Sequence, residues 1–159
     1  MRTALLHLTI AVVWLLLSPQ RDLPRLLFGL GIGWVVLALL HPLLPPDRYL
    51  GASLALFRWL WAFAKTLVLS QVRVAQIILL PSRYPIHPGF LRLPLDDLSD
   101  LEILLLSHSI SLTPGTTTVD VDREQRELLI HALEADSPEE TIAQIRSELL
   151  EPLLEFTRS

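Results

Sequence analysis

The chain has 159 residues, of which 51% are apolar, and its mean hydropathy of +0.46 is high for a protein whose whole surface meets water. Residues 1–92 carry nine Arg or Lys against two Asp, a net charge of +7. Residues 93–159 carry four Arg against fifteen Asp or Glu, a net charge of −11. A basic, apolar half joined to an acidic half predicts two environments rather than one fold. The absence of cysteine excludes disulfides, thiolate metal sites and thiol nucleophiles.

Three apolar segments predict a transmembrane region over residues 1–82, with spans at about 3–18, 23–44 and 50–80. A helix needs about 20 residues to cross a bilayer core of about 30 Å, so the second segment qualifies, the first is short and the third is longer than a span requires. The N-terminus could also pass for a secretory signal. It lacks an A-x-A cleavage pattern, and further apolar segments follow at once, which favours a retained span.

Flanking charges predict how these spans are oriented. The first loop holds Arg21 and Arg25 against Asp22, and further arginines follow the third segment. The positive-inside rule then places the first loop and the C-terminal half in the cytoplasm, with the N-terminus outside. Arg2 on the outer side is a mild contradiction of this topology.

Residues 83–159 predict a small cytoplasmic α+β domain with the order β-α-β-β-α. A strand is expected over residues 89–95, and Ser99 with Glu102 forms a capping box that opens a helix to about Ile110. Residues 116–122 and 127–133 alternate as the two strands of a hairpin. A second capping box at 137–140, with proline at the first helical position, opens a helix to about Phe156.

Three cations lie along the third segment. Arg58, Lys65 and Arg73 follow one another at spacings of seven and eight residues, so they fall within an arc of about 80° on one helix face. Lys65 is near the middle of the predicted span, where an unpaired charge costs at least ~2.5–3.5 kcal/mol. Two interpretations follow for this cationic face: a contact to a neighbouring subunit, which we favour, or a place near an ion route.

Two further motifs are candidates for binding. Gly29 and Gly33 form a G-x-x-x-G face on which another helix can approach closely, which makes them candidates for a subunit interface. Pro114 and Gly115 suit the two central places of a type II turn between a helix and a strand, flanked by Thr113 and Thr116. This loop is either an anion cradle or, as we favour, a tight connection. The histidines lack metal-ligand spacing, so no metal site or cofactor is predicted, and no catalytic motif indicates an enzyme.

Several of these segments together resemble the E subunit of Mrp-type (also called Mnh or Pha) multisubunit sodium/proton antiporters. The resemblance covers nearly the whole chain, and its most specific parts are LTPGT running into TVDV. The matching segments are WLLLS (14–18), KTLVLSQVRVA (65–75), PG (88–89), LPL (93–95), SDL (99–101), LTPGT (112–116), TVDV (118–121) and IHAL (130–133).

The resemblance implies a small accessory subunit that supports assembly and ion transport in a complex exchanging sodium for protons across a prokaryotic plasma membrane. Its partners would be the other subunits and the lipid bilayer, with no nucleic acid. The alternative is a free-standing, membrane-anchored module whose acidic domain recruits a soluble partner.

Overall fold

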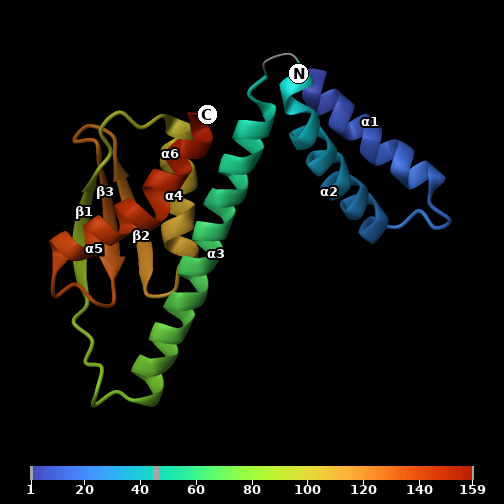
Figure 1. Cartoon of the computed structure of the whole chain (residues 1–159). Coiled ribbons are helices and arrows are strands. Elements are labelled where there is room, and N and C mark those ends of the chain that lie inside the picture. The colour runs from blue at the N-terminus through green and yellow to red at the C-terminus, as the bar shows by residue number, and fades with distance from the viewer. Residues whose placement is uncertain (1, 45–46, 159) are drawn as a thin grey trace. The chain divides into compact units, whose positions relative to one another are not determined.

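The computed structural model describes residues 2–44 and 47–158 and divides into two compact units (Figure 1). The first unit runs to Leu54, and the second from Ala55 to Arg158. The predicted division at residue 82, between membrane and cytoplasm, is a different boundary that these contacts do not test. The compact units divide earlier because residues 55–79 of the third long helix group with the α+β region.

The first unit contains a pair of packed helices, α1 (Arg2–Leu17) and α2 (Leu23–Leu40), followed by the short 3₁₀ helix η1 (His41–Leu43). Asp22 caps α2, because its side chain accepts a hydrogen bond from the Arg25 backbone N–H at 3.0 Å. The connection between α1 and α2 is only five residues long, so the two helices form an antiparallel hairpin.

This helical hairpin has polar and small residues inside and leucines outside. Thr3 and His7 are buried together with Ala11, whereas Leu17 is 80% exposed and Leu39 is 75% exposed. The imidazole of His7 bonds the Leu30 carbonyl oxygen at 2.7 Å through Nε2 and the Tyr49 hydroxyl through Nδ1. A carbonyl only accepts, so Nε2 carries the proton in this arrangement.

Two helices in the described part of the chain are long and apolar enough to cross a membrane. One is Leu23–Leu43, with 21 residues and a mean hydropathy of 2.1, and the other is α3 (Tyr49–Leu79), with 31 residues and a mean hydropathy of 1.4. At 16 residues α1 is shorter than either. The three predicted spans are therefore not confirmed by length and composition.

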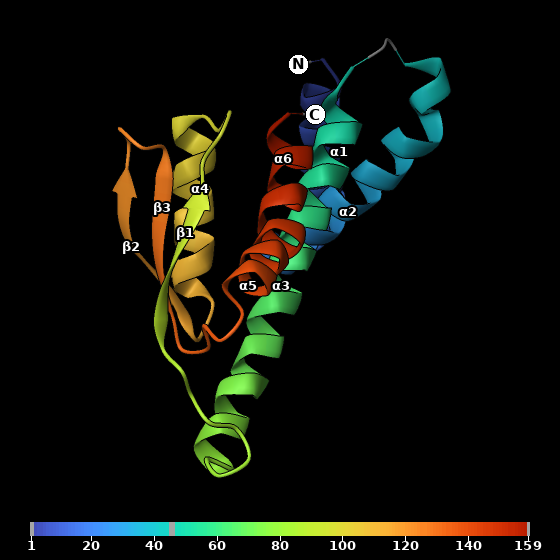
Figure 2. The ribbon, with the colours of Figure 1, turned by 90° about the vertical axis from the view of Figure 1, so that its left-hand side faces the viewer.

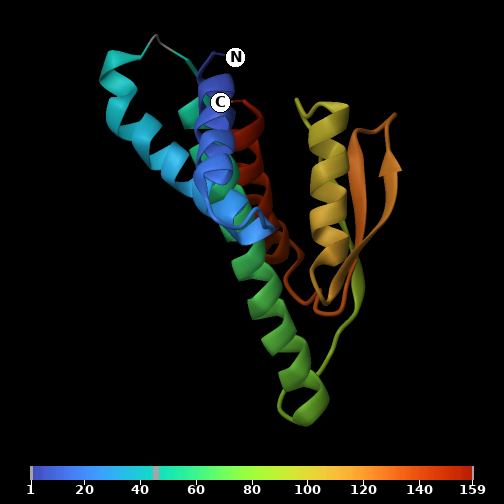
Figure 3. The same cartoon turned by 90° about the vertical axis from the view of Figure 1, so that its right-hand side faces the viewer.

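The C-terminal region has the predicted β-α-β-β-α order. Its elements are β1 (Gly89–Pro94), α4 (Asp100–Leu112), β2 (Thr116–Asp122), β3 (Glu127–Ala132), α5 (Pro138–Ile145), the π-helical turn η2 (Arg146–Leu150) and α6 (Glu151–Thr157). The antiparallel sheet has the order β1-β3-β2, with Leu91 opposite Ile130. Figures 2 and 3 show α4 lying along one face of this sheet.

The core of this region lies between the sheet and its helices. Alternate residues of β1 and β3 point toward the helices, as the period of a strand requires. The largest fully buried side chains are Leu91, Leu93, Leu95, Leu106, Ile110, Leu128, Ile130 and Leu153. All of them belong to one cluster, which is the hydrophobic core of the α+β region.

The two predicted capping boxes have different outcomes. At α4 the prediction is confirmed, since Ser99 and Glu102 exchange both reciprocal hydrogen bonds. At α5 it is wrong, because Ser137 has φ −122° and ψ 81° and its side chain makes no capping bond. The last helix reaches Thr157 but widens into the π turn just before Pro152. Proline lacks the N–H that a regular α-helical turn would use there.

Candidate functional site

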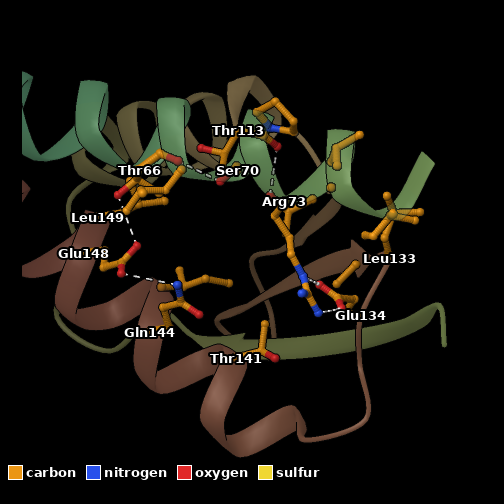
Figure 4. A pocket seen from close by; sticks show the side chains of 18 residues that line it. Thr66, Ser70, Arg73, Thr113, Leu133, Glu134, Thr141, Gln144, Glu148 and Leu149 are labelled. Carbon is orange, nitrogen blue, oxygen red and sulfur yellow. Dashed lines mark hydrogen bonds and ion pairs between the residues drawn. The ribbon is translucent and has the colours of Figure 1, made fainter. Parts of the chain in front are cut away.

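A cleft of about 420 Å³ lies between α3 and the α+β region, inside the second unit (Figure 4). One wall is the cleft-facing side of α3, including Thr66, Ser70 and Arg73. The other comprises the loop after α4, the end of β3 and the inner face of α5 and η2. The cleft therefore brings together two segments singled out in the sequence, namely the cationic helix and the LTPGT loop.

Arg73 closes one end of the cleft by pairing with Glu134 at the end of β3. Its Nε donates to Glu134 Oε2 at 2.8 Å, and its terminal nitrogen donates to the other carboxylate oxygen. The guanidinium carbon also lies 4.7 Å from the centre of the Tyr84 ring. Both partners are partly exposed, so the pair contributes little energy, but the bidentate and stacked geometry fixes the orientation of the arginine.

A second polar contact joins the middle of α3 to η2. The hydroxyl of Thr66 donates to Glu148 Oε2 at 3.1 Å, and the Gln144 amide donates to the other oxygen at 3.3 Å (Figure 4). Thr66 is 9% exposed, so this bond forms on the covered side of α3. The carboxylate of Glu148 thus lies directly beside a helix that itself contains no acidic residue.

An aromatic contact continues the same interface toward the start of α3. Trp59 stacks on Phe156 of α6 with ring centres 5.7 Å apart and planes 11° apart, and Phe63 also packs against the hydrophobic core. Trp59, Thr66 and Arg73 are seven residues apart, so they share one face of α3. The α+β region therefore contacts α3 at points from residue 59 to residue 73.

The LTPGT loop forms the predicted type II turn. Thr116 N donates to the Thr113 carbonyl at 3.3 Å, and Gly115 has φ +94°, a conformation that favours glycine. The Thr113 hydroxyl donates to the carbonyl of Ser109, and that of Thr116 to the carbonyl of Ile110. Both hydroxyls are thus bonded to carbonyl oxygens at the C-terminal end of α4 rather than directed toward a ligand. The geometry therefore favours the tight connection over the anion cradle.

Arg58 and Lys65 lie outside the cleft. Both are exposed, and neither makes a hydrogen bond or ion pair with any residue that the structure describes. The cationic arc predicted on α3 is thus divided: Arg73 turns toward the α+β region, and the other two cations do not. No acidic partner for Lys65 is found among the described residues.

The glycines of α2 face α1 of the same chain. A Cβ on Gly29 would lie 2.9 Å from Trp14 Cδ1, and one on Gly33 would lie 2.8 Å from His7 Cδ2. The close helix approach that G-x-x-x-G predicts is therefore made within the chain. This geometry gives no support to Gly29 and Gly33 as contacts to another subunit.

Comparison with known proteins identifies the family of this chain. The sequence model of a family described as "Na+/H+ ion antiporter subunit" matches residues 7–156. The chain belongs to this family of antiporter subunits. It is 32% identical to the E subunit of the Na(+)/H(+) antiporter of Alkalihalophilus pseudofirmus over 97% of both chains. It is 31% identical to the E1 subunit of the Staphylococcus epidermidis antiporter, over 91% of this chain and 90% of that one.

A solved structure is also similar to this E-family chain. A chain of the Mrp complex from Dietzia sp. DQ12-45-1b shares 28% identity with it, covering 63% of this chain and 89% of that chain, with a TM-score of 0.46. The named relatives are subunits of sodium/proton antiporters. Among the described residues no group of three or more His, Cys, Asp or Glu could hold a metal ion.

The cleft contacts of this E-family chain include residues that the sequence did not single out. Glu134 and Glu148 are 61 and 82 residues from their partners on α3, and Gln144 belongs to a different helix again. Each of these glutamates looks like an ordinary solvated acid in the sequence. No local signal could have found them, because their role arises only when the α+β region packs on α3.

Proposed function

We propose that this chain is an accessory subunit of a multisubunit cation (sodium)/proton antiporter complex, where it supports assembly and ion transport. The observation that carries the proposal is the family match over residues 7–156, together with relatives that are named as E subunits of antiporters and match over nearly their whole length. The free-standing recruitment module has no such support, since no relative named above is described in that way.

An accessory role, rather than an ion route of its own, agrees with the residues of the long helices. None of α1, α2 or α3 contains Asp or Glu. A proton path through a membrane is usually built from carboxylates and histidines. The histidine of α1, His7, is already bonded to the Leu30 carbonyl and to Tyr49. The ion-conducting groups would then belong to other subunits.

The location we propose is the prokaryotic plasma (inner) membrane, with the chain multi-pass and its C-terminal α+β region in the cytoplasm. The inverted burial of the helical hairpin supports a lipid environment for α1 and α2. Small residues at the helix contact and leucines on the outside are the pattern of membrane helix pairs. The fifteen acids of residues 93–159 favour an aqueous environment for the α+β region. The arginines that precede this region in the sequence favour its location on the cytoplasmic side.

The cleft has a structural role in this proposal. Trp59, Thr66 and Arg73 hold the α+β region on α3, so that one surface is presented to the other subunits. The LTPGT loop (Thr113, Pro114, Gly115 and Thr116) lines the cleft beside these contacts. The cleft polar groups described above are engaged with one another rather than left free for a substrate. The subunit-contact role expected for Arg58, Lys65 and the two glycines of α2 is not part of this proposal.

Purification from native membranes tests the proposal. A tagged chain is expected to copurify with large antiporter-like subunits, and its deletion is expected to reduce both the amount of assembled complex and sodium-dependent proton flux in everted vesicles. A matched control restores the chain with Glu155→Gln, an exposed substitution on α6. Recovery of the chain alone, or with a single soluble protein, would contradict the subunit proposal and favour the recruitment module.

A further inference from the structure

The part of α3 that belongs to the second unit has one face covered by the α+β region. The covered face carries Trp59, Thr66 and Arg73, which contact Phe156, Glu148 and Glu134 respectively. From residue 59 to residue 73 the helix advances about 21 Å, at about 1.5 Å per residue. Over that length the acidic region lies directly against it.

The opposite face of α3 is apolar and open. Positions spaced by three or four residues from 57 to 79 lie within a narrow arc of the helix, and every one of them is apolar and exposed. We name this set the apolar stripe. Its members are Phe57, Trp61, Ala64, Val68, Val72, Ala75 and Leu79. Trp61, near its start, is 75% exposed.

Cations lie along one edge of the apolar stripe. Arg58 and Lys65 each directly follow a stripe residue, so both are rotated about 100° from it toward the same side. Both side chains are exposed. An apolar face, a tryptophan within it and basic residues at its edge are the pattern of helices that lie in the membrane interface.

A transmembrane placement of this part of α3 conflicts with the contacts on its covered face. The hydrocarbon core is about 30 Å thick, so a span over residues 55–79 would carry Glu134 and Glu148 into it together with part of the sheet. Sheet edges and loops exposed to lipid do not occur at that depth, because their backbone groups would have no partners. Lys65 would also lie near the bilayer centre without an acidic partner among the described residues.

We infer that α3, from about Ala55 onward, lies flat on the cytoplasmic surface of the membrane with the apolar stripe at the boundary between acyl chains and headgroups. Arg58 and Lys65 then extend to anionic lipid phosphates, and the acidic α+β region faces the cytoplasm. Charge complementarity selects anionic lipid as the occupant of the stripe. The cations Arg58 and Lys65 lie at the edge of the stripe, and all the acids of the second unit come after α3 in the sequence. This inference rests on the proposed membrane location and replaces the predicted third span.

The inference also changes the predicted topology. If α1 and α2 cross the membrane as a hairpin, both of its ends are cytoplasmic, because α3 starts only five residues after η1. Arg2 and Arg48 then lie on the cytoplasmic side, which removes the contradiction noted for Arg2. The outer loop then holds Arg21 and Arg25, of which Arg25 is paired with Asp22, so Arg21 replaces Arg2 as the exception to the positive-inside rule. A 16-residue α1 spans about 24 Å, so the bilayer would thin locally around it.

Spin labels on single cysteines test the inference directly, since the chain contains no cysteine to remove. Labels are placed at stripe positions by Phe57→Cys, Val68→Cys and Val72→Cys, and at the edge by Lys65→Cys. Val35→Cys in α2 serves as a depth standard for the bilayer interior. Collision rates with oxygen and with a water-soluble nickel chelate, measured in proteoliposomes, give the depth of each label.

The expected result is a shallow, periodic pattern. All three stripe labels lie roughly 5–10 Å below the phosphates, and the edge label meets the nickel chelate. A depth that rises steadily from residue 57 to residue 68 and includes residue 65 would show a span and overturn the inference. Stripe labels shielded from both reagents in the assembled complex, but not in the chain alone, would assign the stripe to another subunit and overturn it as well.

A second variant tests the lipid headgroups. Arg58→Gln combined with Lys65→Gln should abolish any difference in the depth of the Val68→Cys label between anionic and zwitterionic vesicles, whereas Arg83→Gln, outside α3, should leave it. An unchanged difference would contradict the headgroup contact. Copurification with antiporter subunits is measured separately on the wild-type chain. Loss of copurification together with shallow labels at the stripe would contradict the proposed function alone. Retained copurification together with deeply inserted stripe labels would contradict only this inference.

Discussion

The helical hairpin and the α+β region bury opposite kinds of residue. In the hairpin, Thr3, His7 and Gly33 lie at the contact between helices, and leucines such as Leu17 face outward. In the α+β region, leucines of β1, β3 and α4 fill the core, and of its described acids only Glu102 is buried. One chain thus packs its two parts in opposite ways, which agrees with the location proposed above, with lipid around the hairpin and water around the α+β region.

Truncation of a core leucine should give the largest effect in the α+β region. Leu106 is fully buried, so Leu106→Ala should lower the free energy of unfolding by about 2–5 kcal/mol through lost contacts and a residual cavity. Hydrogen exchange of the β1 and β3 amides, measured on the full chain in micelles, reports the loss. Leu104→Ala on the exposed side of the same helix is the matched control. Equal effects of the two substitutions would contradict the described core.

A lysine introduced on the surface should separate the two regions most sharply. Val35 in α2 and Val119 in β2 are 51% and 52% exposed, so they differ in surroundings rather than in burial. Val35→Lys should cost about 2.5–3.5 kcal/mol for insertion if its surface faces hydrocarbon. Val119→Lys should change stability by no more than about 0.5 kcal/mol if its surface faces water. The amount of inserted chain in membranes checks the first, and hydrogen exchange the second.

If Val35→Lys inserted as well as the wild type, the outward leucines of the hairpin would have to be covered by protein or water. The outer surface of the hairpin would then not face lipid. A strong effect of Val119→Lys would instead show that the exposed side of β2 is an interface in the assembled complex. The two valines therefore test both regions with the same chemical change.

The buried carboxylate of Glu102 should give the next largest effect on the stability of the α+β region. Burial raises the pKa of the Glu102 carboxyl, but hydrogen bonds from Arg158, the Ser99 backbone and Thr157 outweigh it and hold the pKa at about 2, below its ordinary 4.5. Because the folded-state pKa is the lower one, this stability is present above pH 4.5 and is lost as pH falls from about 4.5 to about 2. At about 1.4 kcal/mol per unit, the contribution is on the order of 3 kcal/mol.

Unfolding as a function of pH measures this contribution. The difference in stability between the wild type and Glu102→Gln should be largest near neutral pH and should shrink as pH falls from 4.5 to 2. Glu155→Gln on α6 is the control, because that exposed acid makes no hydrogen bond or ion pair with the described residues. A difference that stays constant over this pH range would show that the hydrogen bonds do not favour the charged form of Glu102.

The sequence predicted the local features of both regions and missed the tertiary ones. The Ser99 cap and the turn at Gly115 depend on residues within four positions of each other, and both were found. The contacts of α3 with Glu134 and Glu148 cross more than sixty positions and had no local signal. The cationic arc of α3 was visible, but which of its faces the α+β region covers depends on packing.

The glycines of α2 illustrate the same limit in the hairpin. Their spacing predicted that a helix would approach closely, which is a local property of α2. Whether that helix belongs to another subunit or to the same chain depends on the loop at residues 18–22, which folds α1 back onto α2. A sequence with a longer loop would carry the same motif and could leave it free for another subunit.

A methyl group added at α2 gives the smallest effect and tests the inside of the hairpin. A Cβ at Gly33 would lie 2.8 Å from the His7 ring, whereas one at Gly31 would meet nothing within 4 Å. Gly33→Ala should therefore cost about 1–3 kcal/mol by forcing the helices apart, and Gly31→Ala should be neutral or slightly stabilising. SDS-induced unfolding, followed by circular dichroism, compares the two. Since both changes add the same group to the same helix, equal costs would mean that α1 does not pack on α2 through Gly33, and the polar interior of the hairpin would lose its support.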